Sequence, residues 1–288
     1  MNLLLGAHRA TVGGRHHALY SGAEIGCEAV QIFTSSPRQW KEQPVTDADL
    51  TAWEEARRAT GIQHLVAHDS YLINLCAGDP AVRERSVTAF AAELRRCDQL
   101  DIPYLVTHPG AHVGAGEAAG IAEFATTMRR IYDLAPELRA VTLLETTAGQ
   151  GTCLGHRFEQ LAELIEKIDL PDKVAVCLDT CHVFAAGYDL RDEAGYQATM
   201  QSLESTFGAA AVRVLHLNDS KTDLGSRVDR HEQIGEGYLG DRAFQQVITD
   251  PRFAGRPMLL ETPDLERHAD NLERLRRLAR DVLHGESR

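Results

Sequence analysis

The sequence Val174-Ala175-Val176-Cys177-Leu178, followed directly by Asp179, contains the pattern that predicts the fold. It is a short, continuous apolar run that ends in a residue able to bind a metal ion. Such runs are typical of parallel strands that are buried on both faces. We therefore predict a buried strand here, with Asp179 at its carboxyl end.

Seven similar apolar runs lie elsewhere in the chain, at residues 3–5, 29–33, 64–67, 104–107, 141–144, 212–215 and 258–260. Helical patterns separate them: residues 46–60 are closed by Gly61, and Asp79 precedes Pro80 where another helix should begin. Eight strand and helix units in one chain predict an α/β protein, a (β/α)8 TIM barrel that forms a single domain over residues 1–288.

Two other organisations are open at this point. A length of 288 residues, at roughly 150 residues per domain, suggests two domains, although α/β barrels of about 250 residues are a known exception. A doubly wound open sheet would need a glycine-rich phosphate turn after the first strand. The segment Gly6-Ala7-His8-Arg9 does not match that G-x-G-x-x-G motif, which favours the barrel.

Composition narrows the class of protein. The chain is 43% hydrophobic and 25% charged, as expected of a folded globular protein. Its net charge of −12 has the wrong sign for binding nucleic acid by bulk charge, but bound divalent cations or a local basic patch would still allow a nucleic-acid substrate. The six cysteines form no Cys-x-x-Cys pair, which favours reduced thiols and a cytoplasmic location. Since no long uncharged apolar run is present, we expect neither export nor a membrane partner.

Residues able to bind a metal follow six of the eight predicted strands. Any one of them has an ordinary explanation as a helix cap or a hydrogen-bonded loop residue. In a barrel, however, the carboxyl ends of all strands meet at one face, and only His, Asp and Glu occupy these six places. This bias favours convergent metal ligation. The six residues are His68, His108, Glu145, Asp179, His216 and Glu261.

Two further clusters extend this set to nine candidate ligands. They are Asp179-Thr180-Cys181-His182 and Asp229-Arg230-His231. The Asp-x-His spacing of the second lets both side chains of an extended segment point the same way. Nine ligands exceed the three or four that one catalytic zinc takes, so we expect two or three metal ions with a bridging carboxylate. Imidazole and carboxylate ligands suit zinc, with manganese acceptable at one site.

At these residues the chain resembles the endonuclease IV family of apurinic/apyrimidinic endonucleases over nearly its whole length. The matching segments include residues 68–75, His108-Pro109-Gly110, residues 144–151, residues 177–182, residues 185–189, residues 216–221 and residues 225–231. The resemblance implies a TIM barrel with three zinc ions that cleaves duplex DNA on the 5′ side of an abasic site. The products would be a 3′-hydroxyl and a 5′-deoxyribose phosphate, and trimming of 3′-blocked ends is also expected.

The resemblance also implies a ligand set and DNA contacts. The first zinc would take His68, His108 and Glu145. The second would take Glu145, Asp179, His216 and Glu261, which makes Glu145 the bridge, and the third would take His182, Asp229 and His231. In the matching loops, Arg38, Tyr71 and Leu72 would enter the duplex. Apart from the resemblance, Lys221, Arg227 and Arg230 are grouped on the loop that carries Asp229 and His231, which makes them candidates for phosphate contacts, with an ordinary solvated surface as the alternative.

Clustered zinc ions would supply the deprotonated water and the charge neutralisation that phosphodiester hydrolysis needs. We expect Glu145 and Glu261 to be catalytic, with Glu261 orienting the attacking water as well as binding metal. Because the DNA must lie across the open end of the barrel, we expect a monomer.

Two alternatives remain. Glu145, Asp179, His216 and Glu261 alone would suit a single-metal sugar isomerase or epimerase of the xylose isomerase-like barrel group, but such an enzyme has no evident use for the other five ligands. A zinc-stabilised DNA-binding module is disfavoured by the net charge and by the lack of cysteine-rich closed sites.

Overall fold

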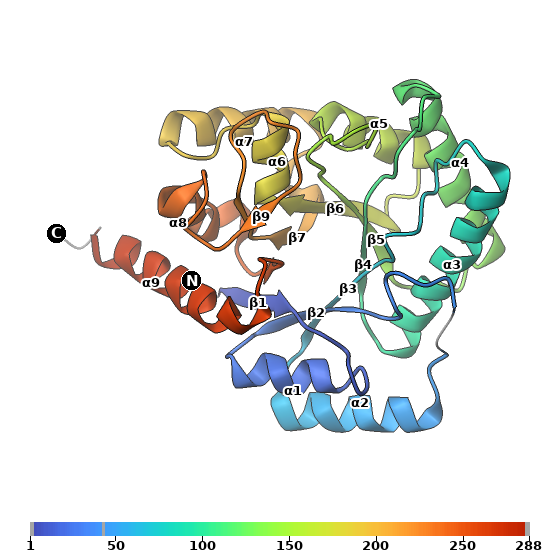
Figure 1. Ribbon diagram of the computed structural model, residues 1–288, viewed down its shortest axis with the longest axis horizontal. Coiled ribbons are helices and arrows are strands. Elements are labelled where there is room, and N and C mark those ends of the chain that lie inside the picture. The colour runs from blue at the N-terminus through green and yellow to red at the C-terminus, as the bar shows by residue number, and fades with distance from the viewer. Residues whose placement is uncertain (1–2, 42–43, 286–288) are drawn as a thin grey trace.

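Eight parallel strands close into a barrel in this computed structural model, which describes residues 3–41 and 44–285. The strands are β1 (Leu4–His8), β2 (Ala29–Phe33), β3 (His64–His68), β4 (Tyr104–Thr107), β5 (Val141–Glu145), β6 (Val174–Asp179), β7 (Val212–His216) and β10 (Pro257–Leu260). Their order around the barrel is β1-β10-β7-β6-β5-β4-β3-β2 (Figure 1). The predicted TIM barrel is therefore confirmed, and the open-sheet alternative is wrong because β1 pairs with both β2 and β10.

Helices surround the barrel (Figure 1). They are α1 (His17–Glu24), α2 (Asp47–Thr60), α3 (Pro80–Gln99), α4 (Glu117–Leu134), α5 (Phe158–Ile168), α6 (Thr180–Ala186), α7 (Glu193–Thr206), α8 (Gly240–Thr249) and α9 (His268–Gly285). The 3-10 turns are η1 (Ala209–Ala211), η2 (Pro251–Phe253) and η3 (Leu265–Arg267), and β8 (Asp219–Ser220) with β9 (His231–Glu232) forms a small antiparallel hairpin outside the barrel. No described helix is long and apolar enough to cross a membrane.

Local sequence signals explain where these helices begin and end. Thr46 and Asp49 form a capping box at the start of α2, and Gly61 ends the helix with a φ of 71°. The Asp79 carboxylate accepts a hydrogen bond from the Ala81 amide, and Pro80 occupies the first turn of α3. The predicted helix boundaries therefore agree with the structure to within about a residue.

The barrel interior is built in layers. A buried apolar layer is separate from the core between strands and helices, and it comprises Ala29, Val66, Val106, Leu143, Ala175, Cys177, Val214 and Leu259. Since side chains alternate between the two faces of a strand, the residue two positions further along each strand also faces the interior. From β2 onward these positions hold Gln31, His68, His108, Glu145, Asp179, His216 and Glu261. The same step on β1, from Gly6, leads to His8. One apolar layer thus supports one polar layer at the carboxyl end of the barrel.

Candidate metal centre

Glu145, at the end of β5, is the centre of this polar layer. Its carboxylate is fully buried and is approached by four imidazoles. The Nε2 atoms of His68 and His108 lie 3.1 and 3.0 Å from Oε2. On the other carboxylate oxygen, Oε1, the Nδ1 atoms of His216 and His182 lie at 2.9 and 3.3 Å. A carboxylate shared by this many imidazoles is suited to bridging cations.

Charge interactions in this cluster are strong. Burial by itself raises the pKa of Glu145, but the surrounding histidines, His216 and His108 first, hold that pKa well below its usual value. Burial would lower the pKa of His68, yet its hydrogen bond to Glu145 and the nearby carboxylates raise it to about 9. The pKa of Glu261 falls to about 2, because His216 outweighs the effect of burial. Protonated His68 and His216 thereby balance the negative charge of the Glu145 and Glu261 carboxylates.

The nine predicted ligands come together in three groups. Within each group, the ligand atoms all lie within 4.8 Å of one another. The groups are His68, His108 and Glu145; Glu145, Asp179, His216 and Glu261; and His182, Asp229 and His231. In a further grouping Cys181 joins Asp179 and His231, which both already belong to the other groups. Five imidazoles and four carboxylates at this spacing fit divalent metal ions of the zinc class.

The third group is assembled differently from the other two. His182 lies in the first turn of α6, where the Asp179 carboxylate accepts a hydrogen bond from its backbone amide. Asp179 thus caps a helix that begins at Thr180, and the first helical turn positions His182. The Oδ1 atom of Asp229 lies 3.2 Å from Nε2 of His182 and 3.4 Å from Nε2 of His231. The two Nε2 atoms are 3.4 Å apart.

The loop that carries Asp229 and His231 is anchored by Asp219. This buried carboxylate accepts hydrogen bonds from five backbone amides, those of Ser220, Gly235, Gly237, Leu239 and Gly240, at 2.7–3.3 Å. A Cβ atom at Gly237 would clash with the Ser220 carbonyl oxygen, so only glycine fits there.

Partners outside the cluster fix the orientation of several histidines. Nδ1 of His68 faces the Asp69 carbonyl at 3.0 Å, Nδ1 of His182 faces the Thr146 carbonyl at 2.8 Å, and Nδ1 of His231 faces the Glu261 carbonyl at 3.1 Å. Each of these Nδ1 atoms therefore donates its proton to a backbone oxygen and leaves Nε2 free to bind a metal.

The residues predicted to contact DNA lie around the rim. Tyr71 is 63% exposed and packs edge-on against Phe33, while Leu72 is half-buried. Arg38 is exposed on the loop after β2. Lys221, Arg227 and Arg230 are exposed on the segment between β8 and β9. Three loops thus place all six side chains at the end of the barrel that carries the predicted metal ligands.

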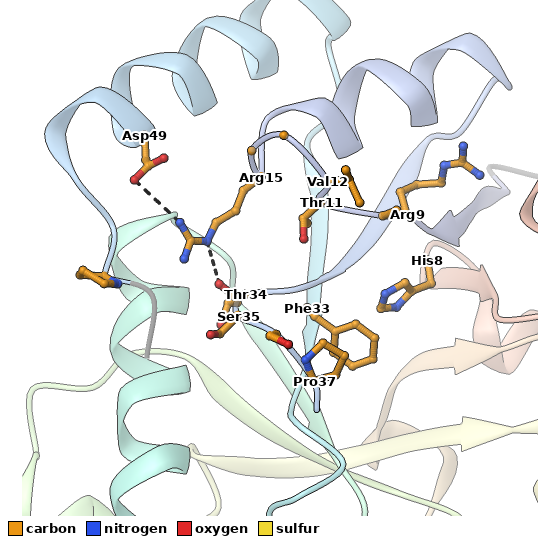
Figure 2. Close-up of a pocket in the computed structure, with 15 residues that line it drawn as sticks. His8, Arg9, Thr11, Val12, Arg15, Phe33, Thr34, Ser35, Pro37 and Asp49 are labelled. Atoms are coloured by element: carbon orange, nitrogen blue, oxygen red, sulfur yellow. Dashed lines mark hydrogen bonds and ion pairs between the residues drawn. The ribbon is translucent and has the colours of Figure 1, made fainter. Parts of the chain in front are cut away.

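The loop carrying Arg38 is held by a charged network that sequence reasoning missed. The Arg15 side chain donates to the Thr34 carbonyl at 2.7 Å and lies 3.9 Å from the Asp49 carboxylate, as Figure 2 shows. The Thr34 hydroxyl bonds to Glu93, which also pairs with Arg96 at 3.0 Å. These contacts join residues far apart in sequence, so no local pattern indicates them.

A pocket of about 590 Å³ opens between this loop and the loop after β1. His8 and Phe33 lie together in its wall, with ring centroids 4.4 Å apart (Figure 2). Burial lowers the pKa of His8 to about 4, so this imidazole is neutral. The sequence patterns indicate no role for His8, but the structure places it beside the predicted ligands, 3.8 Å from Oε1 of Glu261.

The fold and this cluster indicate a broad class of barrel proteins, and comparison with known proteins agrees. A family described as "Xylose isomerase-like TIM barrel" matches residues 19–278. Among solved structures, a D-tagatose 3-epimerase-like protein has a TM-score of 0.76 at 17% identity and covers 98% of this chain and 99% of its own. At that identity the likeness establishes the barrel fold alone.

Other relatives identify the family. A protein named "Probable endonuclease 4" from Chloroflexus aurantiacus (strain ATCC 29366 / DSM 635 / J-10-fl) is 50% identical over 280 residues, which are 97% of this chain and 98% of that protein. The crystal structure of endonuclease IV from Thermus thermophilus has a TM-score of 0.84 at 35% identity and covers 96% of this chain and 99% of its own. The chain belongs to the endonuclease IV family of enzymes, as its motifs predicted.

Proposed function

We propose that this enzyme is a zinc-dependent DNA-repair endonuclease that hydrolyses the phosphodiester bond on the 5′ side of an abasic site in duplex DNA. The observation that carries this proposal is the convergence of four imidazoles on the buried Glu145 carboxylate, with further ligand side chains around it. The close relatives named endonuclease 4 support it.

Three zinc ions would be held by the three groups described above. We assign the first to His68, His108 and Glu145, the second to Glu145, Asp179, His216 and Glu261, and the third to His182, Asp229 and His231. Manganese is an alternative at one of these sites. When bound, the ions supply an activated water and neutralise the negative charge that develops on the phosphate.

The reaction exchanges one bond to phosphorus for another. The oxygen of water bonds to phosphorus, the bond from phosphorus to the 3′ oxygen breaks, and that oxygen takes up a proton to become the 3′-hydroxyl. The phosphate stays on the abasic sugar as a 5′-deoxyribose phosphate. No covalent intermediate with the protein is needed, because water is the nucleophile.

Within the first two groups, Glu261 is the best placed carboxylate to orient the attacking water. Its side chain is 18% exposed, whereas those of Glu145 and Asp179 are fully buried. Glu145 shares its two oxygens between the first two groups and sets their spacing. A Glu261→Gln variant that keeps full metal content and full activity would contradict this role.

The exposed rim would recognise the damaged duplex. An abasic nucleotide has no base to read and leaves a weak point in the base stack, which side chains can enter. We assign this to Arg38, Tyr71 and Leu72, and phosphate contacts to Lys221, Arg227 and Arg230. We also propose that the enzyme acts as a monomer, that it trims 3′-blocked ends, and that it works in the reducing cytoplasm, which its six free cysteines suit.

The test uses duplex DNA with a single tetrahydrofuran abasic analogue, which cannot undergo β-elimination. Zinc-loaded protein should leave a 3′-hydroxyl directly 5′ of the analogue, and chelator should abolish the cleavage. If folded protein with three zinc ions per chain does not cleave, the proposal fails. The sugar isomerase alternative, which needs one metal, would then be tested on ketoses.

A further inference from the structure

The polar layer of the barrel contains two residues that are not among the nine ligands. Its eight positions, one per strand, hold six predicted metal ligands together with His8 on β1 and Gln31 on β2. Gln31 is fully buried, in a strand that reads as an apolar run. A buried amide needs hydrogen-bond partners, and Gln31 finds them in the second ligand group.

The contacts of Gln31 determine which way its amide faces. Its Nε2 atom lies 2.5 Å from Oε1 of Glu261 and 3.1 Å from Nδ1 of His8, and its Oε1 atom lies 2.8 Å from Nε2 of His216. An ionised carboxylate only accepts hydrogen bonds, so the NH₂ group must face Glu261. The amide oxygen then accepts from His216, which must carry its proton on Nε2.

With Nε2 as the donor to Gln31, Nδ1 is the nitrogen of His216 that faces the metal centre, and it would bind a metal once its proton is displaced. That nitrogen lies 2.9 Å from Glu145 and 3.3 Å from Glu261. For His68, His182 and His231 the outward nitrogen faces a backbone carbonyl, which no side-chain substitution removes. His216 instead depends on a side chain for its orientation.

We propose that Gln31 is a positioning residue of the metal centre, which fixes the tautomer of His216 and holds Glu261 in place. The inference rests on the proposed zinc-dependent function, since the second group must bind a metal for it to matter. His8 supports the same contact, because its Nδ1 accepts the second N–H of the Gln31 amide. One amide thereby orients two of the four ligands in the group.

Two variants separate the two contacts. Gln31→Met has a similar volume and loses both, so we expect the affinity of one of the three zinc ions to fall about 10- to 100-fold, the usual range for lost outer partners of ligands. Gln31→Glu still accepts from His216 but repels Glu261. It should keep its zinc while kcat for abasic cleavage falls about tenfold or more. KM should stay unchanged in both, because the side chain is buried away from the rim.

Zinc affinity would be measured by competition with a chromophoric chelator, and kcat and KM on the tetrahydrofuran duplex. Gln246→Leu is the matched control. The Gln246 side chain lies on α8, where its amide donates a hydrogen bond to the Leu190 carbonyl at 2.9 Å and faces none of the predicted ligands. The native sequence, measured first, tests the proposed function independently of either variant.

Wild-type zinc affinity in a folded Gln31→Met protein would overturn the inference. Should that variant not fold, the decision passes to Gln31→Glu, where wild-type kcat would overturn it. Failure of both variants to fold in the presence of zinc would also count against it, because a positioning role leaves the barrel intact.

Discussion

The candidate metal centre has two regions that are built in different ways. The first two groups come from residues at the ends of barrel strands, and Glu145, Asp179 and His216 among them are fully buried. The third group takes His182 from a short helix and the other two ligands from the hairpin segment, where the Asp229 side chain is 40% exposed and that of His231 is 17% exposed. Strand ends are held by the barrel, whereas the hairpin ligands depend on a few anchoring contacts.

This difference suggests separate roles for the two regions. A rigid, buried part suits the groups that act on the reacting atoms, because such geometry must be held closely. A loop-borne part can adjust when the substrate arrives, because loops open at a lower free-energy cost than core strands. The hairpin also carries Lys221, Arg227 and Arg230, so binding of DNA and the geometry of the third group are expected to be coupled.

The largest effect should come from the carboxylate shared within the strand-borne region. Glu145→Gln removes the charge that both groups use, so we expect loss of two zinc ions per chain and at least about a 10³-fold loss of cleavage, corresponding to several kcal/mol. Zinc per chain by mass spectrometry and cleavage rates provide the measurement. Glu166→Gln, on the exposed surface of α5, serves as the control. Retention of three zinc ions would show that the two groups are not organised around Glu145.

Removal of metal should distinguish the two regions by rate. With excess chelator we expect one zinc ion to leave at least about ten times faster than the other two, because two of its ligands lie on a segment outside the barrel, which opens more readily than the barrel strands. A stopped-flow zinc indicator follows the release. His231→Ala should eliminate the fast phase, and a single rate for all three ions would remove the distinction between the regions.

Loosening the anchor of the hairpin should affect the third group alone. Asp219→Asn replaces a charged acceptor of five backbone hydrogen bonds by a neutral amide, so we expect roughly a tenfold weaker third zinc and about 1–3 kcal/mol lower stability. Chelator competition and denaturant unfolding measure the two effects. Equal weakening at all three sites would mean that the hairpin supports the whole centre.

The smallest effect is the pH dependence of the metal-free protein. The raised pKa of His68 contributes stability that is present below the unfolded value of 6.5 and is lost as the pH rises through about 9. The lowered pKa of Glu261 contributes stability that is present above 4.5 and is lost as the pH falls toward about 2. The metal-free protein should therefore be most stable between about pH 4.5 and 6.5, where both contributions are fully present.

Zinc should reverse the trend on the alkaline side, because it displaces protons from the imidazoles and so binds more tightly as the pH rises. Between about pH 6 and pH 8.5 we expect the metal-free protein to lose on the order of 1 kcal/mol while the added stability from zinc increases. Urea unfolding of both forms measures this. Parallel profiles for the two forms would contradict the charge state derived for the strand-borne cluster.

Much of the site was predictable from the sequence because of strand periodicity. Glu145 and His216 end apolar runs, and the ends of parallel strands in a barrel face one another whatever the loops do. The same periodicity predicts that Gln31 faces the interior, two positions beyond Ala29. A single amide in an apolar run, however, gives no sign of a function until its hydrogen-bond partners are known. The six rim residues are placed at the right end of the barrel, and their contacts with DNA stay predictions.

The sequence by itself therefore determined the eight strands, the end of the barrel at which the site lies and the nine ligand candidates. Each of these follows from a local pattern that is repeated along the chain. Only the tertiary structure decided which ring nitrogen of each histidine faces the centre, how Asp219 anchors the hairpin, and how Arg15 and Glu93 hold the loop that carries Arg38. The physical reason is that these contacts join segments that are far apart in the sequence. Hydrogen bonds and ion pairs between distant segments depend on where the chain returns in space, and no local periodicity records that position.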